Sequence, residues 1–433
     1  MSQRRGKIRR GSTDGVATLE ARRRRTERLV AGATVTAPQT SADAVERPIT
    51  WLPVAVFAAL PVVGMIAGPA YAALVFGLGA VQFLHAVMTR SARLPRDRVL
   101  LGLALAFAGL AWASTSWSIV PAQSVRGALQ LTGIFAAALI VLDHRPEPGR
   151  IAPILLRWAQ LAFVLGAAIV CLDALSGYPL QSLLSAGKVH AFTKYNRGGD
   201  YGVLLLWPLL AAAVARRDGP MALLLAVAAA LALAAGYSVT GRIAVVVGVV
   251  VLAASFVSRR AVARGLVAGT VLLAILLPVI LRGLAEHRDR IAADFFPTEH
   301  LQVSGGHRLE IWDYMTARVF ERPLLGWGIK SAKAVPIRPD ELSRYRYVDA
   351  DGIYPHNQWL QLWIETGATG TALALALALV VLARIRRSTP PERQPFAYAA
   401  YASALAISLA NFEITTDSWW AALVACAALF AAL

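Results

Sequence analysis

Three basic side chains stand at polar interruptions in an otherwise apolar chain. Arg242 lies in YSVTGRIAVVVG (237–248), a short turn between two apolar runs. Arg308 and His356 lie in a long polar segment, 282–356. Arginine stays protonated and can hold two phosphate oxygens at once, while histidine can take up a proton near neutral pH. These residue types suit the binding of a phosphate and proton transfer beside it.

The end of the polar segment predicts a helix N-terminus. Pro355 disfavours helical backbone at Tyr354, so we expect a helix to begin at about His356 or Asn357, with Asn357 as its cap. Free N–H groups and a partial positive charge there would suit a phosphate.

Simpler interpretations of the same residues remain open. Arg242 can reach toward the interface instead of meeting an anion, His356 can make a structural hydrogen bond, and Arg308 can be one solvated charge among several.

The elements that must position these residues are membrane helices. The chain has 433 residues, of which 57% are hydrophobic and 16% charged, against about 25% charged in soluble domains. Its apolar runs are continuous rather than alternating, which excludes a β-barrel and predicts an all-α polytopic membrane protein. We expect about twelve transmembrane helices, near 50–67, 69–89, 99–117, 122–142, 151–173, 200–215, 220–238, 242–257, 265–281, 357–383, 396–411 and 419–433.

The distribution of Lys and Arg predicts the orientation. The short segments on one side, 90–98, 143–150, 216–219, 258–264 and 384–395, carry 4, 2, 2, 3 and 4 of them. The short links on the other side carry none. Basic loops stay in the cytoplasm, so both termini are expected there. The large loop 282–356, between the ninth and tenth helices, then faces outward.

The loop and the tail carry further signals. Residues 307–321 predict an amphipathic helix that can lie flat on the membrane, with Leu309, Trp312, Met315 and Val319 on its apolar side. Residues 340–356 are expected to be irregular and to close over the site. The tail, 1–47, holds 11 Lys/Arg and five acids. It predicts either a disordered, orienting tail or a contact with anionic inner-leaflet lipids, and no nucleic-acid binding. The remainder, 48–433, is the transmembrane domain.

Several motifs resemble one family. Arg308 in GHRLEIW, the PLLGWG turn and HNQWLQLWIETGATG (356–370) are similar to the signature region of the O-antigen ligase and polymerase superfamily. WASTSWSIVPAQSV (112–125) resembles the family's early outer loop, and TGR (240–242) its short arginine-bearing turn. The likeness covers most of residues 50–433 and leaves the basic tail outside.

The resemblance implies a GT-C-like glycosyltransferase of the bacterial inner membrane. It would move a glycan from an undecaprenyl-pyrophosphate carrier to a sugar hydroxyl of lipid A–core, on the periplasmic side. By the same likeness, Arg242 and Arg308 hold the donor pyrophosphate and His356 is the catalytic acid or base. Arg197 in KYNRGGD (194–200) matches a basic position that is less well defined in the family and lies before a membrane span. Arg197 and Asn357 would then join the pyrophosphate site.

Alternatives and cofactors complete the prediction. A polymerase that joins lipid-linked repeat units into a growing polysaccharide would use the same residues. A transporter is disfavoured because the two halves show no matching pattern. Asp349 and Asp351 form a DxD triplet that could hold a divalent cation. Because the resembled family works without metal, we expect a metal-independent enzyme with no cofactor.

Overall fold

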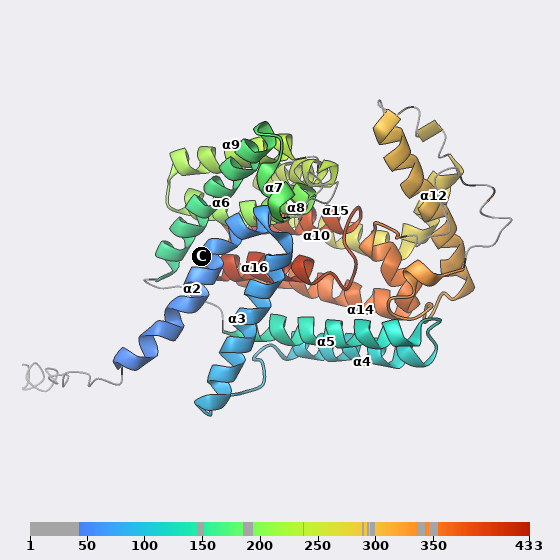
Figure 1. Cartoon of the computed structure of the whole chain (residues 1–433), viewed down its shortest axis with the longest axis horizontal. Coiled ribbons are helices and arrows are strands. Elements are labelled where there is room, and N and C mark those ends of the chain that lie inside the picture. Colours follow the sequence, from blue (N-terminus) through green and yellow to red (C-terminus); the bar gives the residue numbers. More distant parts are fainter. Residues whose placement is uncertain are drawn as a thin grey trace, which may run out of the picture. The chain divides into compact units, whose positions relative to one another are not determined.

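The computed structural model describes residues 43–144, 151–184, 194–236, 238–287, 299–336 and 354–433, with isolated residues 290, 291, 294, 343 and 345 between them. Its regular elements are helices throughout these ranges (Figure 1). They are α2 (Asp43–Ile66), α3 (Gly68–Met88), α4 (Arg98–Ala113), η1 (Ser114–Ser116), α5 (Pro121–Asp143), α6 (Ile151–Leu175), α7 (Pro179–Leu184), α8 (Lys194–Ala215), α9 (Gly219–Ala235), α10 (Val239–Glu286), α12 (Glu299–Glu321), η3 (Ala332–Ala334), α14 (Gln358–Ser388), α15 (Gln394–Ser408) and α16 (Asp417–Ala432).

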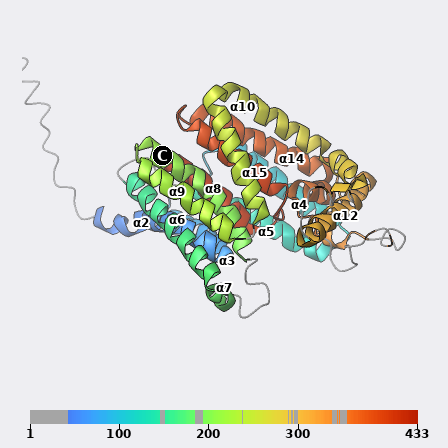
Figure 2. The same ribbon diagram turned by 90° about the horizontal axis from the view of Figure 1, so that it is seen from above.

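Each of the twelve predicted apolar runs coincides with a helix or with part of one. Among the described residues, seven helices are long and apolar enough to cross a membrane. The chain is therefore a polytopic, all-helical membrane protein, while the count of twelve spans stays a prediction. Two predicted spans fall within α10, which is continuous except at Ser258, where φ is −155° and ψ is 98°. Figure 2 shows the two limbs of α10 diverging from this bend.

Local capping explains where several helices begin. The carboxylates of Asp97 and Asp218 accept hydrogen bonds from the amides of Leu100 and Met221, each at 3.1 Å. These caps satisfy amides that the first helical turn leaves without partners. Short polar connections thus end one apolar helix and start the next.

The segments predicted to lie on the cytoplasmic side contact one another. Arg384 pairs with Asp97 at 2.6 Å, and Arg259 donates to the carbonyl of Pro391. The predicted outer segments do the same, since Lys330 of the large loop pairs with Glu413 at 3.2 Å. This grouping agrees with the predicted alternation of helix ends. The assignment of one group to the cytoplasm stays a prediction.

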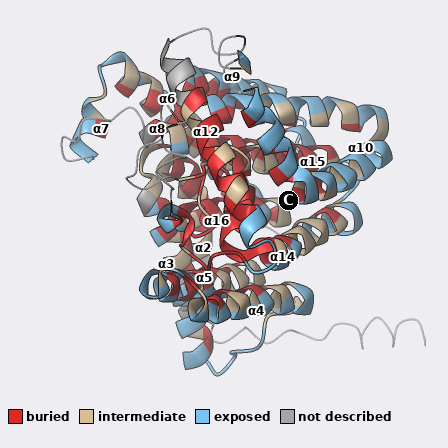
Figure 3. Cartoon of the chain, turned by 90° about the vertical axis from the view of Figure 1, so that its right-hand side faces the viewer, coloured by how far each residue is buried: buried red, intermediate tan, exposed pale blue. Residues whose placement is uncertain are grey.

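Residues 52–433 form one unit with two buried apolar clusters. One lies among α2, α3, α6, α8, α9 and α16, and the other among α4, α5, α10, α12 and α14. Large apolar side chains such as Leu105, Leu223 and Val246 are exposed on the outer faces. Figure 3 shows exposed residues along α4 and α10 and buried ones around α12 and α16. An apolar exterior of this kind suits helices that face lipid.

The helix expected over 307–321 exists, but its apolar side does not lie on a membrane surface. α12 begins earlier, at Glu299, and its Leu309, Met315 and Val319 are buried. Met315 and Val319 join a core cluster with residues of α10 and α14. Figures 1 and 2 both show α12 at one end of the unit, beside the ends of α4 and α14. The flat-lying interpretation is therefore wrong, because packing against neighbouring helices buries the same apolar side chains.

A break in α14 receives the turn that follows α12. At Gly367, φ is 61° and ψ is −158°, so the helical hydrogen bonds are interrupted there. The freed carbonyls of Ile364 and Glu365 accept from the amides of Trp327 and Gly328 at 2.8 and 3.0 Å. In return, the amides of Ala368 and Thr369 donate to the carbonyls of Pro323 and Leu324 at 2.8 and 3.2 Å. The PLLGWG turn is thus joined to α14 by its backbone.

Candidate functional site

A buried carboxylate joins three segments that are far apart in the chain. Asp200, in the second turn of α8, has no exposed surface. Its two oxygens accept from Ser238 Oγ and Asn411 Nδ2, both at 2.8 Å. Ser238 caps α10 by accepting from the amide of Gly241 at 2.9 Å. Asp200 therefore ties the start of α8 to the arginine-bearing turn and to the connection between α15 and α16.

Arg308 and Arg197 lie near enough to Asp200 for their charges to act on it. Arg308 comes from α12 and is half-buried, whereas Arg197 is exposed in the first turn of α8. Within the described part of the chain, neither has an ion pair or hydrogen bond. Burial lowers the pKa of Arg308, and the nearby Asp200 and Tyr354 oppose that shift. Guanidinium groups without partners, held near a buried carboxylate, can accept an anionic ligand.

His356 lies near enough to Arg308 for the charge of that arginine to act on it. Burial, followed by the charge of Arg308, lowers the pKa of His356 to about 4. Its imidazole is therefore neutral at neutral pH and can accept a proton. The Tyr354 ring packs edge-on against it, with 4.6 Å between ring centroids. His356 has a φ of 47°, at the sharp entry to α14.

A second charged group borders His356. Glu413 accepts from Lys333 at 2.9 Å and from Lys330 at 3.2 Å. Burial alone would raise the pKa of Glu413, but the two lysines together lower it below its ordinary value. The ammonium of Lys333 also lies 5.3 Å from the centroid of the Tyr354 ring. The connection between α15 and α16 therefore supports the segment that carries Tyr354 and His356.

Arg242 is placed differently from the expectation. Its guanidinium donates to the carbonyls of Leu233 at 3.0 Å and Gly236 at 2.9 Å. These carbonyls end α9, so Arg242 caps that helix, as cations at helix C-termini commonly do. Among the described residues, no anionic side chain pairs with Arg242. Arg242 still lies within four residues of Ser238, which bonds Asp200.

Asn357 is the cap of α14, as predicted. Its Oδ1 accepts from the amides of Trp359 and Leu360 at 3.1 and 3.0 Å, and only 1% of the residue is exposed. The structure therefore gives Asn357 a role in fixing the entry to α14 next to His356. Two of the first-turn amides expected to face a phosphate are already satisfied by this cap.

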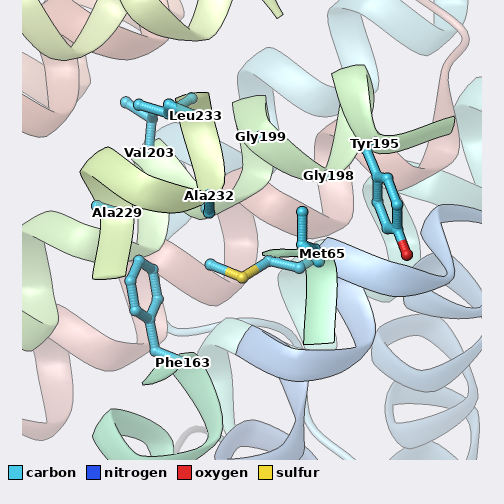
Figure 4. A pocket seen from close by; sticks show the side chains of 11 residues that line it. Met65, Phe163, Tyr195, Gly198, Gly199, Val203, Ala229, Ala232 and Leu233 are labelled. Carbon is cyan, nitrogen blue, oxygen red and sulfur yellow. The ribbon is translucent and has the colours of Figure 1, made fainter. Parts of the chain in front are cut away.

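An apolar crevice lies beside the same end of α8. It is lined by residues of α2, α6, α8 and α9, among them Met65, Phe163, Gly198 and Leu233. Figure 4 shows the Met65 side chain between Phe163 and the backbone at Gly198. None of the predicted site residues lines this crevice.

Three parts of the sequence prediction lie outside the described residues. These are the DxD triplet, Asp349 and Asp351, and most of the irregular segment 340–356. The same holds for residues 1–42 of the basic tail. Their predicted roles stay predictions.

The structure adds Asp200 and Tyr354 to the predicted site. Asp200 stands in KYNRGGD, three residues after Arg197, and an acid at the start of an apolar run was a signal that could have been followed. Tyr354 gave no such signal, because a tyrosine before Pro355 is unremarkable in sequence. Asp200 and Tyr354 both join the candidate site through contacts with segments that are distant in the chain.

Comparison with known proteins identifies a family for part of this chain. Residues 224–375 match the family model described as O-antigen ligase. This stretch holds Arg242, Arg308, His356 and Asn357, together with the break at Gly367. The chain carries a domain of the O-antigen ligase superfamily. Arg197 and Asp200 precede the matched stretch, and Asp200 contacts it through its hydrogen bond with Ser238.

Relatives named as candidate polysaccharide ligases occur in Rickettsia. The one from Rickettsia bellii is 23% identical over 333 residues, 73% of this chain and 76% of its own length. That from Rickettsia conorii is 27% identical over 126 residues, 28% of this chain and 29% of its own. That from Rickettsia typhi is 25% identical over 148 residues, 34% and 35% respectively. The chain thus spans about a third of the length of the last two relatives.

Proposed function

We propose that this protein transfers a glycan from an undecaprenyl-pyrophosphate carrier to a sugar hydroxyl of lipid A–core, on the periplasmic face of the inner membrane. The observation that carries the proposal is the placement of Arg308 and Arg197 near Asp200, with His356 near Arg308, inside or next to the stretch that matches the O-antigen ligase family. It combines a neutral base with two cations that have no ion pair or hydrogen bond among the described residues.

The arginines would bind the pyrophosphate. Negative charge on this leaving group grows as the glycosidic bond breaks, and fixed positive groups then bind it more strongly than they bind the ground state. Arg308 and Arg197 can serve directly because they have no other partners among the described residues. Arg242 would need to release the carbonyls at the end of α9, or to act from that position through its charge.

His356 would take the proton of the acceptor hydroxyl. In the free protein its pKa is lowered to about 4, by burial first and then by Arg308, so it is a weak base. When a pyrophosphate neutralises Arg308, that second contribution is cancelled and the pKa of His356 rises. The base would therefore strengthen when the donor is bound. This suits general-base catalysis, which typically raises a reaction rate by about 10²–10⁴-fold.

The test is a complementation assay in a strain that lacks this gene. Wild type should restore polymer on lipid A–core, whereas Arg308→Ala and His356→Ala should abolish transfer while the protein still inserts. Arg290→Ala is the matched control, because Arg290 lies in the same loop and its exposed side chain pairs only with Asp294 at 3.6 Å among the described residues. Normal transfer by both site variants would overturn the site.

The same strain separates the ligase from the polymerase. Complete loss of glycan on lipid A–core in the deletion supports the ligase. Single repeat units that remain attached to lipid A–core would instead show that the protein polymerises repeat units, and the ligase proposal would fall.

A further inference from the structure

Tyr354 ends in a buried oxygen without a partner. In the described part of the structure its hydroxyl makes no hydrogen bond, although a phenol can donate one and accept others. Leaving a buried polar group unpaired costs free energy, so such groups are rare and often mark a place where a ligand binds. The other groups around Tyr354 indicate which ligand.

The ring of Tyr354 is held while its hydroxyl stays available. The carbonyl of the next residue, Pro355, accepts from Trp312 Nε1 at 2.8 Å. His356 packs against one part of the ring, and the Lys333 ammonium lies 5.3 Å from its centroid. Since these contacts involve the ring and the backbone, they fix the side chain without using its oxygen.

The charges near the phenol are those of the proposed donor site. Arg197 and Arg308 act on it from α8 and α12, and Glu413 and Glu365 act in the opposite sense. Burial, and then Glu413, raises the pKa of Tyr354 well above its ordinary value. The hydroxyl therefore keeps its proton at neutral pH and can donate a hydrogen bond, but it cannot serve as a base.

We propose that the Tyr354 hydroxyl donates a hydrogen bond to a phosphate oxygen of the pyrophosphate-linked donor, beside Arg308 and Arg197. This inference rests on the proposed function. An anion drawn to the two guanidinium groups would lie near the phenol, and the ligand would satisfy the oxygen that the protein leaves unpaired. A bond from a fixed neutral donor strengthens as charge develops on the leaving group.

The test compares Tyr354→Phe with wild type in the full-length, detergent-solubilised protein. Farnesyl pyrophosphate is the probe, and its affinity is measured by titration calorimetry. A hydrogen bond to a charged acceptor predicts about 10- to 100-fold weaker binding. The ligand-free melting temperature should stay the same or rise, because the variant removes an unpaired buried hydroxyl.

Tyr401→Phe is the matched control. It makes the same chemical change at α15, where the hydroxyl lies 2.9 Å from Thr270 Oγ1 in α10. Its affinity for farnesyl pyrophosphate should equal that of wild type.

Each result decides one of the two proposals. Wild-type affinity in Tyr354→Phe, or weaker binding accompanied by a lower ligand-free melting temperature, overturns the role of Tyr354 and leaves the proposed function in place. Failure of the wild-type protein both to bind the probe and to transfer glycan overturns the proposed function, and the inference with it.

Discussion

Gly367 allows the PLLGWG turn to join α14, and its replacement by alanine tests that connection. A Cβ at this position would lie 2.4 Å from the carbonyl carbon of Leu324 and 2.5 Å from its oxygen. Neither atom can move freely, because both belong to backbone. The combination of φ 61° and ψ −158° is also one that residues with side chains rarely adopt.

The expected loss follows from the contacts at this junction. Four backbone hydrogen bonds join the turn to α14, and each contributes about 1 kcal/mol net. The strained conformation adds about 1–3 kcal/mol. Gly367→Ala should therefore destabilise the protein by roughly 5–7 kcal/mol. At about 1 °C per kcal/mol for a chain of this length, the melting temperature should fall by roughly 5–8 °C.

The assay is thermal unfolding in detergent, followed by intrinsic tryptophan fluorescence. Gly269→Ala is the control, since a Cβ there has no atom within 4 Å and the residue lies inside α10. That variant should match wild type or gain slightly. If Gly367→Ala melted within about 3 °C of wild type, the close backbone contact between the turn and α14 would be refuted.

Three further predictions concern the site. Asp200→Asn replaces one acceptor oxygen by an amide group that donates, so either Ser238 Oγ or Asn411 Nδ2 loses its acceptor. We expect kcat/KM for glycan transfer to fall at least about 10-fold. Unchanged kinetics would contradict the role of Asp200 in positioning these segments. Because the pKa of His356 is about 4 in the folded protein and near 6.5 when unfolded, the unfolded state binds more protons between these values, and stability should fall as the pH drops from about 6.5 to 4. His356→Gln should show a smaller fall in melting temperature over that range, and an equal fall would show that other groups are responsible. Finally, glycan transfer by the purified protein should be unchanged in EDTA, whereas loss restored by a divalent cation would indicate a metal at Asp349 and Asp351.

Local signals predicted the helices well. Continuous apolar runs have to satisfy their backbone hydrogen bonds internally when they lie in lipid, so each run forms a helix wherever its neighbours are. The cap at Asn357 could be predicted equally well, because its side chain accepts hydrogen bonds from amides only two and three residues ahead. The motifs around Arg308 and His356 indicated the superfamily for a related reason, since each motif is one uninterrupted stretch of the chain.

Contacts between distant segments could not be predicted in this way. The apolar side of α12 predicts burial but does not say whether lipid or protein covers it. The pairing of Asp200 with Ser238 and Asn411 joins residues 38 and 211 positions away. Arg242 could not be assigned to the end of α9 until the geometry of the turn was known.

Composition and short motifs thus specify an all-helical membrane chain with basic residues at its polar interruptions, because helix formation and capping depend on near neighbours. Which of those residues meet, and which remain free to bind an anion, depends on packing. Arg308 lies near Asp200 and His356 only because α12 packs against α10 and α14, while Arg242 is held by carbonyls. Side-chain partners of this kind are set by the three-dimensional arrangement of the helices.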